Sequence, residues 1–245
     1  MPPFITGPEV SNVTARLADA LKFSGIISII YGVFCFLLPH TPPKHNAVEK
    51  LAFKKAFKLF NYSSFTILVI TSLAVSIIHQ IYFLQTGPFL SHIGISDSQI
   101  GPAMTIGQFA EILTMAYLGY FLKRIGYKNV IFIGVLAYFA RYAIFGTTIF
   151  PVWVIVISQA FHGFCYAFFF ATAFIYVDKI SDEDVRHSAQ TVFGIIILGG
   201  GPVIGGWLSG KLQELYTIAG VFDFSSFWYT LSAIGMITGI FFFFF

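Results

Sequence analysis

The chain has 245 residues and a formal net charge of +3; 57% of its residues are hydrophobic and 10% are charged. A soluble globular domain typically has a charged fraction of about 25%, and the mean hydropathy of +0.81 is far above that of such a domain. The composition excludes a soluble domain and predicts an integral membrane protein, for which we expect no nucleic-acid partner.

Apolar segments long enough to cross a bilayer recur along the chain. A membrane-spanning helix needs roughly 20 mostly apolar residues. We expect seven such helices, at 20–39, 64–86, 101–122, 130–147, 152–175, 190–209 and 225–245. No segment alternates with the period of a membrane β-barrel strand, so the predicted fold is an all-α membrane bundle.

The segment 40–62 is the one candidate linker. It opens with Pro42 and Pro43 and then becomes basic, with apolar residues among its lysines. This pattern favours a helix that lies on the anionic cytoplasmic leaflet, and a partner-binding element is the alternative. We therefore expect two parts: 1–62, with an N-terminal tail, one membrane helix and the basic linker, and 63–245, with six membrane helices.

Basic residues concentrate in alternate loops. The loops 91–100 and 147–151 contain neither Lys nor Arg, whereas those after the first, third and fifth membrane helices are basic. By the positive-inside rule the basic loops are cytoplasmic. This orientation places the N-terminal tail outside and the C-terminus in the cytoplasm of a multi-pass protein of the cell (inner) membrane. The loop cations are Lys44, Lys50, Lys54, Lys55, Lys58, Lys123, Arg124, Lys128, Lys179 and Arg186.

Glu111 is the only carboxylate near the middle of an apolar segment. Ionisable residues at membrane depth are costly and usually mark substrate or proton pathways. With a rise of about 1.5 Å per residue, Glu111 and Arg141 lie roughly 16 Å and 18 Å from the cytoplasmic ends of neighbouring helices. Because the two residues lie at the same depth, Arg141 is predicted to form a structural ion pair with Glu111. Contact of Arg141 with a substrate is the alternative. Because a carboxyl group can also exist neutral, Glu111 can bind and release a proton.

Four other polar residues lie within the membrane helices. Gln108 is one helical turn from Glu111, Gln80 lies in the second helix, and His162 and Tyr166 lie near the middle of the fifth. Their amide, imidazole and phenol groups offer donors and acceptors that suit a polar, uncharged solute. For His162 and Tyr166, a role in helix packing is an equally good interpretation.

The segment GYFLKRIGYK, from Gly119 to Lys128, is similar to a loop signature of the major facilitator superfamily. In that signature a charged pair and a second glycine separate two membrane helices, and Gly126 would allow the tight turn. Lys123 stands where many members have Asp.

Further stretches resemble the nucleoside:proton symporter family within that superfamily. They are LPHTPP at 38–43, GQFAE at 107–111, FLKR at 121–124 and RHSAQ at 186–190. The resemblance runs from about residue 20 to the end. It implies that the chain holds helices 6 to 12 of such a transporter, lacks helices 1 to 5, and is a partial gene product.

The resemblance also implies a function. As part of a full-length transporter, the chain would carry out proton-coupled symport of nucleosides, with the missing N-terminal half and the lipid bilayer as its other partners. Positions matching Gln80, Gln108, Glu111, His162 and Tyr166 would line the nucleoside site, with Glu111 as the proton-coupling residue. Phe83 falls where the family often has a polar residue.

Several alternatives to nucleoside transport remain. They are transport of another polar metabolite, a channel, and a non-functional fragment or structural membrane protein. An intramembrane hydrolase would need a nucleophile and a base, and Ser76 and His79 are one turn apart but lack an orienting acid in their helix. Because this pair is incomplete, we expect no catalytic residues. Because the sequence also has no metal-binding motif, we expect no metal and no cofactor.

Overall fold

The computed structural model describes residues 8–40, 57–147, 149–183 and 185–245. The chain divides into two units, Met1–Ala47 and Val48–Phe245. The first unit contains one helix, α1 (Pro8–Cys35), whose apolar part, Leu21–Cys35, coincides with most of the first predicted membrane helix. The predicted domains, 1–62 and 63–245, stay a prediction, and the basic segment at 41–56 lies outside the described residues.

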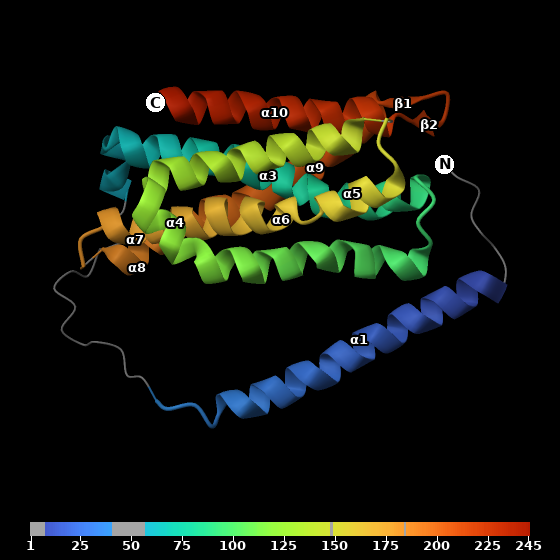
Figure 1. Ribbon diagram of the computed structural model, residues 1–245. Helices are drawn as coiled ribbons and strands as arrows, with labels where there is room; N and C mark the ends of the chain where they lie inside the picture. The colour runs from blue at the N-terminus through green and yellow to red at the C-terminus, as the bar shows by residue number, and fades with distance from the viewer. Residues whose placement is uncertain (1–7, 41–56, 148, 184) are drawn as a thin grey trace. The chain divides into compact units, whose positions relative to one another are not determined.

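Helices make up nearly all of the described second unit (Figure 1). Five helical stretches of the described residues are long and apolar enough to cross a membrane. These are α3 (Ser63–His92), α4 (Asp97–Gly146), α5 to α7 (Val152–Ile180), α8 to α9 (Arg186–Leu215) and α10 (Phe224–Phe244), and a short 3-10 helix, η1 (Leu59–Asn61), precedes them. The predicted all-α membrane fold is confirmed.

Helix α4 accounts for two of the predicted membrane helices. It has 50 residues and is bent sharply at Gly126, where φ is +78° and ψ is 167°. Glycine adopts a positive φ at little cost because it lacks a β-carbon. The predicted turn between 101–122 and 130–147 is therefore present, and the two halves of α4 cross the unit in opposite directions (Figure 1).

The loops of this unit alternate between its two ends (Figure 1). The bend at Gly126, the connection between α7 and α8 and the C-terminus of α10 lie at one end, and the connections after α3 and after α4 lie at the other. Lys123, Lys128, Lys179 and Arg186 therefore share the end that the sequence assigns to the cytoplasm. Which side of the membrane this end faces stays a prediction.

Two of the membrane helices change their hydrogen-bonding pattern near their middle. In the first, α5 (Val152–Ser158) and the single turn α6 (Phe161–Gly163) lead into the π-helical turn η2 (Phe164–Ala171) and then α7 (Thr172–Ile180). In the second, α8 (Arg186–Gly194) leads into the π-helical turn η3 (Ile195–Gly200) and α9 (Gly201–Leu215). Such π-helical turns are rare and frequently occur at functional sites.

A small β-hairpin between α9 and α10 was not predicted. Strands β1 (Thr217–Ile218) and β2 (Val221–Phe222) pair antiparallel around Ala219 and Gly220, whose φ values are 52° and 82°. Two consecutive left-handed residues are typical of the tight turns that match the strand twist. The hairpin leads directly into the start of α10.

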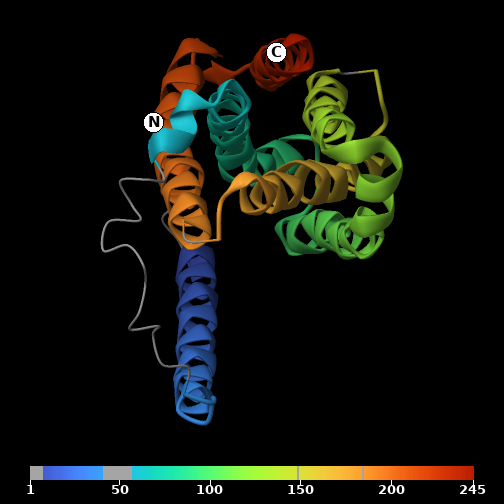
Figure 2. The same ribbon diagram turned by 90° about the vertical axis from the view of Figure 1, so that its left-hand side faces the viewer.

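Helix α4 packs on η2 and on α10, and α10 also packs on α3 (Figure 2). Aromatic side chains fill the interior between these helices. Between membrane helices the driving force is close packing, because lipid is as apolar as the side chains themselves. Rings and small residues alternate across these contacts. The largest fully buried rings are Phe65, Tyr82, Tyr138, Tyr142, Phe145, Phe168, Phe169, Phe193, Phe227 and Trp228.

Candidate functional site

A row of three ionisable side chains crosses the middle of the second unit. Nη1 of Arg141, on α4, lies 3.0 Å from Nδ1 of His162, on α6. Nε2 of the same imidazole lies 3.7 Å from Oε2 of Glu111, on the other half of α4. The expected direct ion pair between Glu111 and Arg141 is wrong for the described structure, because His162 stands between the two charges.

Two glycines bring Glu111 next to His162. A β-carbon at Gly107 would lie 3.0 Å from the β-carbon of His162, and one at Gly163 would lie 2.8 Å from the backbone nitrogen of Glu111. Small residues at a crossing let two membrane helices approach closely. The first half of α4 therefore packs directly on α6, and the carboxylate and the imidazole face each other as a result.

Arg141 is fully buried and is surrounded by tyrosine rings. Its guanidinium carbon lies 3.9 Å from the ring centre of Tyr82, 5.2 Å from that of Tyr142 and 5.5 Å from that of Tyr138. A desolvated cation–π contact contributes about 2 kcal/mol. Among the described residues no carboxylate lies within ion-pair distance of Arg141, so ring faces and His162 compensate its charge.

Hydrogen bonds to neighbouring helices hold these rings in place. The Tyr82 hydroxyl donates to Oε1 of Gln159 at 2.8 Å, and the Tyr138 hydroxyl bonds Nδ1 of His79 at 2.7 Å. The Tyr142 hydroxyl donates to a backbone carbonyl of α3 at 2.9 Å. Because each bond joins two membrane helices, the cage around Arg141 ties α3, α4 and the α5–α7 stretch together.

His79 belongs to this site, although the sequence reading did not include it among the binding residues. Its ring stacks on His162 with centres 5.5 Å apart and an angle of 15°, and its centre lies 6.4 Å from that of Tyr166. The signal in the sequence was spacing, because residues three or four apart share one face of a helix. The pairs are His79 with Tyr82, Tyr138 with Arg141 and Tyr142, and Gln159 with His162.

The five predicted binding residues do not all meet. His162 is buried beside the partly buried Glu111, and Tyr166 is exposed four residues after His162, with its ring near that of His79. Gln108 is exposed, one turn before Glu111 on the same helix. Gln80 is turned toward α9, where its β-carbon lies 2.9 Å from the position a β-carbon would take at Gly205. Their binding roles stay predictions.

The hydrogen bond from Arg141 determines where a neutral His162 carries its proton. A guanidinium group can only donate, so Nδ1 of His162 must accept. The imidazole proton is then on Nε2, the atom that faces Glu111. The site can therefore present one N–H donor to an ionised carboxylate, and the buried arginine supplies a fixed positive charge behind it.

The described residues do not support the hydrolase alternative. The Ser76 hydroxyl donates to the carbonyl of Ile197 at 2.5 Å, while Nδ1 of His79 is bonded to Tyr138. The two side chains are thus engaged with different partners. Nor do the described residues contain a group of three or more His, Cys, Asp and Glu side chains that could hold a metal ion.

A bundle of long apolar helices with a carboxylate and a buried cation at its middle is typical of multi-pass membrane transporters. The family profile described as Nucleoside H+ symporter matches residues 10–245. The chain therefore belongs to the nucleoside:proton symporter family, and the resemblance found in the sequence is confirmed.

Known relatives share this family and fold. The nucleoside permease NupG of Escherichia coli is 30% identical over 240 residues, which are 91% of this chain and 56% of NupG. The putative nucleoside transporter YegT of the same bacterium is 30% identical over 76% of this chain and 45% of its own length. A crystal structure of NupG matches with a TM-score of 0.73 at 27% identity, over 89% of this chain and 57% of NupG. The chain spans about half the length of the relatives it matches.

Proposed function

We propose that the chain forms the C-terminal half of a transporter that carries nucleosides together with protons across the cell (inner) membrane. The observation that carries the proposal is the partly exposed Glu111 held beside His162 and Arg141 in a bundle of this family. In the proposed orientation the end of the bundle with Gly126 and the C-terminus faces the cytoplasm.

Glu111 is the proposed coupling residue. When it is ionised, Nε2–H of His162 donates toward it and the charge of Arg141 lies directly behind. When it is protonated, the carboxyl group becomes a donor and can bond a sugar hydroxyl or a base acceptor of the solute. A nucleoside that binds better when Glu111 is protonated also favours binding of the proton to Glu111. Symport requires that each of the two ligands strengthens binding of the other in this way.

The proposed nucleoside site lies on the exposed side of this row. Gln108, one turn before Glu111, and Tyr166, four residues after His162, are exposed, and they would contact the solute from two helices. Transporter sites of this kind lie between two halves of the protein. The missing N-terminal half is therefore the proposed partner that closes the site, and it would cover the same exposed surface.

A chimaera tests the proposal directly. Residues 10–245 would replace the matching C-terminal part of NupG in cells that lack their own nucleoside transporters, and uptake of labelled uridine would be measured with and without an inward proton gradient. We expect uptake against a concentration gradient that disappears when a protonophore removes the proton gradient. The unfused chain serves as a second arm, and we expect it not to accumulate uridine.

Two outcomes would contradict the proposal. Gradient-independent flux through a correctly inserted chimaera would favour a channel, and accumulation of a different polar metabolite in preference to uridine and adenosine would change the substrate class. A panel of unlabelled competitors, including free bases, ribose and amino acids, separates the second outcome from nucleoside transport.

A further inference from the structure

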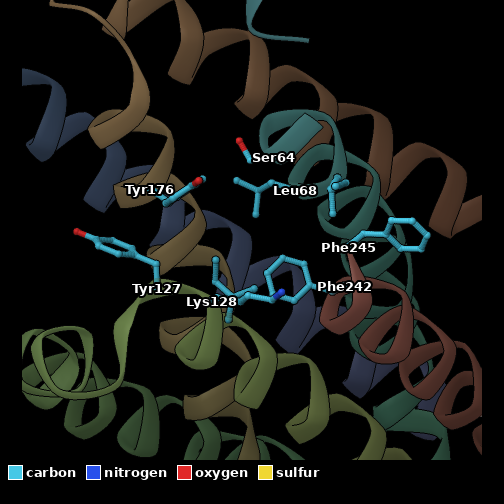
Figure 3. Close-up of a pocket in the computed structure, with 9 residues that line it drawn as sticks. Ser64, Leu68, Tyr127, Lys128, Tyr176, Phe242 and Phe245 are labelled. Atoms are coloured by element: carbon cyan, nitrogen blue, oxygen red, sulfur yellow. The ribbon is translucent and has the colours of Figure 1, made fainter. Parts of the chain in front are cut away.

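A cavity of about 120 Å³ lies at the Gly126 end of the second unit, where Tyr127 and Lys128 follow the bend. Figure 3 shows the residues that line it. Four helices supply its wall: the starts of α3 and of the second half of α4, the late part of α7 and the end of α10. Its lining residues are Ser64, Ile67, Leu68, Tyr127, Lys128, Ile131, Tyr176, Phe242 and Phe245.

The cavity is smaller than the pockets that typically hold a molecule of the size of a nucleoside. Pockets for small molecules of that kind are typically about 300–1,000 Å³, whereas a water molecule occupies about 30 Å³ of the liquid. The cavity thus has room for about four waters, which is the scale of a single phosphodiester group with its neighbouring carbon atoms.

Four polar groups of the lining are free to bind a ligand. The hydroxyls of Ser64, Tyr127 and Tyr176 and the ammonium group of Lys128 make no hydrogen bond or ion pair within the described part of the chain. Lys179 adds a second cation beside them, with its Nζ 4.6 Å from the ring centre of Tyr127. The Tyr176 hydroxyl points into the cavity whereas that of Tyr127 points away from it (Figure 3), and a hydroxyl donor beside two cations suits an anion.

The two cations outnumber the carboxylates at the cavity. No Asp or Glu is among the described residues that line it, and the α-carboxylate of Phe245 is one negative charge against Lys128 and Lys179. Asp178, two residues after Tyr176, is bound by Arg186 at 3.6 Å and by Gln190 at 3.1 Å. The local charge at the cavity is therefore positive.

The rest of the lining is apolar. Leu68, Ile131 and Phe242 are buried, and Phe245 is an exposed ring at the rim. A free phosphate ion would gain nothing from this surface, whereas the glycerol and first acyl carbons of a phospholipid would bury apolar area against it. Since Ser64 and Lys128 stand at the ends of membrane helices, the cavity lies at the level of the lipid headgroups.

We propose that this cavity binds one anionic phospholipid. The phosphodiester lies against Lys128 and the hydroxyl of Tyr176, and the glycerol and acyl carbons lie against Leu68, Ile131 and Phe242 (Figure 3). Basic pockets between membrane helices on the cytoplasmic side bind anionic headgroups for the same physical reason. The proposal does not depend on which solute the protein carries.

Native mass spectrometry of the purified full chain tests the site. The protein would be released from detergent with equal amounts of phosphatidylglycerol and phosphatidylcholine, and the bound fraction of each would be counted. We expect one phosphatidylglycerol to be retained in preference. In Lys128→Gln the preference should fall about five-fold, which corresponds to the contribution of about 1 kcal/mol from one lysine near an anionic surface.

Lys123→Gln is the matched control, because Lys123 is exposed at the same end of the bundle but does not line the cavity. An equal loss of preference in this variant would overturn the proposal in favour of general surface charge. Ser64→Trp provides an independent check, since the added ring occupies the cavity without removing a cation. Retention of phosphatidylglycerol in Ser64→Trp would contradict the site.

Inorganic phosphate separates the lipid from a free anion. If phosphate at millimolar concentration displaced the bound phosphatidylglycerol, or bound by itself with the same dependence on Lys128, the ligand would be the free ion and the proposal would be wrong. We expect neither effect, because the apolar lining contributes only to binding of the lipid.

Discussion

The polar residues at the middle of the bundle and the charged residues at its ends are held in different ways. In the middle, Arg141, His162 and Glu111 contact one another across helices. At the ends, most charged groups bond residues close to them in the chain, as Lys211 does with Glu214 and Asp223 with Ser226. Asp178 is the exception, because it bonds Arg186 and Gln190 of the next helix.

This difference separates the roles of the two regions. A contact between helices determines how those helices pack, and in a transporter it can change when the helices move. A contact between residues three or four apart on an exposed surface contributes only about 0.3–0.5 kcal/mol. Substitutions in the middle should therefore change transport and assembly, whereas those at the ends should have small and local effects.

The largest expected effect is that of Glu111→Gln. Glutamine has nearly the same size but cannot bind and release a proton, so the chimaera with NupG should lose proton-driven accumulation of uridine. Binding or exchange of uridine should remain. Glu214→Gln is the control, since it removes an exposed carboxylate that is paired with Lys211 on the same helix. Unchanged accumulation with unchanged pH dependence in Glu111→Gln would remove this residue from the coupling step.

A change at Arg141 tests the fixed protonation pattern of His162. Arg141→Met removes the donor to Nδ1, so His162 should populate both neutral forms instead of the one with its proton on Nε2. The ring nitrogen chemical shifts of His162, identified by comparison with His162→Gln, report this directly. Arg141→Lys retains a donor and should restore the original pattern. The same shifts in Arg141→Met as in the unsubstituted chain would contradict the hydrogen bond.

The close approach of α4 and α6 can be broken at Gly163. A side chain there would collide with the backbone of Ala110 and Glu111. Gly163→Val should reduce stability by about 1–3 kcal/mol, the typical cost of overpacking, and should lower the maximal uptake rate of the chimaera. Gly199→Val is the control, because a β-carbon at Gly199 meets nothing within 4 Å. Equal unfolding temperatures for the two variants would mean that the crossing tolerates a side chain.

Gln108→Ala should weaken binding of the solute without affecting proton coupling. An unpaired polar group of a bound solute costs about 1–3 kcal/mol, so the concentration for half-maximal uptake should rise roughly 5-fold to 150-fold. Gln99→Ala, another exposed glutamine near the start of α4, should leave it unchanged. A decrease in proton dependence in Gln108→Ala, with unchanged apparent affinity, would assign Gln108 to coupling instead.

The sequence predicted the helices better than it predicted their contacts. Long apolar segments and the glycine at position 126 are local signals, and the structure has membrane helices and a bend at those places. The depth of Arg141 and Glu111 followed from the rise of a helix, but depth does not say which way a side chain points around its helix. The direct ion pair was therefore a wrong prediction. His162 was predicted to bind the solute, and its position between Glu111 and Arg141 was not predicted.

The contacts that were missed depend on residues far apart in the chain. Gly107 and Gly163 make the crossing close, and no single segment shows that they meet. Likewise, Gln80 and His79 are neighbours in sequence, but one faces α9 and the other faces His162. The side that each residue faces was set by how the helices pack, which the apolar pattern of α3 alone does not contain.

The smallest expected effect concerns Asp223, an exposed carboxylate at the start of α10. Hydrogen bonds from the side chain and the backbone N–H of Ser226 lower the pKa of Asp223 below its ordinary value. A carboxyl group with a lowered pKa in the folded protein stabilises it fully above the ordinary pKa of about 3.9, and the effect is lost as the pH falls through the folded pKa. Asp223→Asn keeps an acceptor for Ser226 but does not titrate. Thermal unfolding between about pH 6 and pH 3 should therefore depend slightly less on pH in Asp223→Asn than in the unsubstituted protein, while uptake by the chimaera stays the same. A loss of transport as large as that expected for Glu111→Gln would show that charges at the ends of the bundle also act between helices, and the distinction between the two regions would fail.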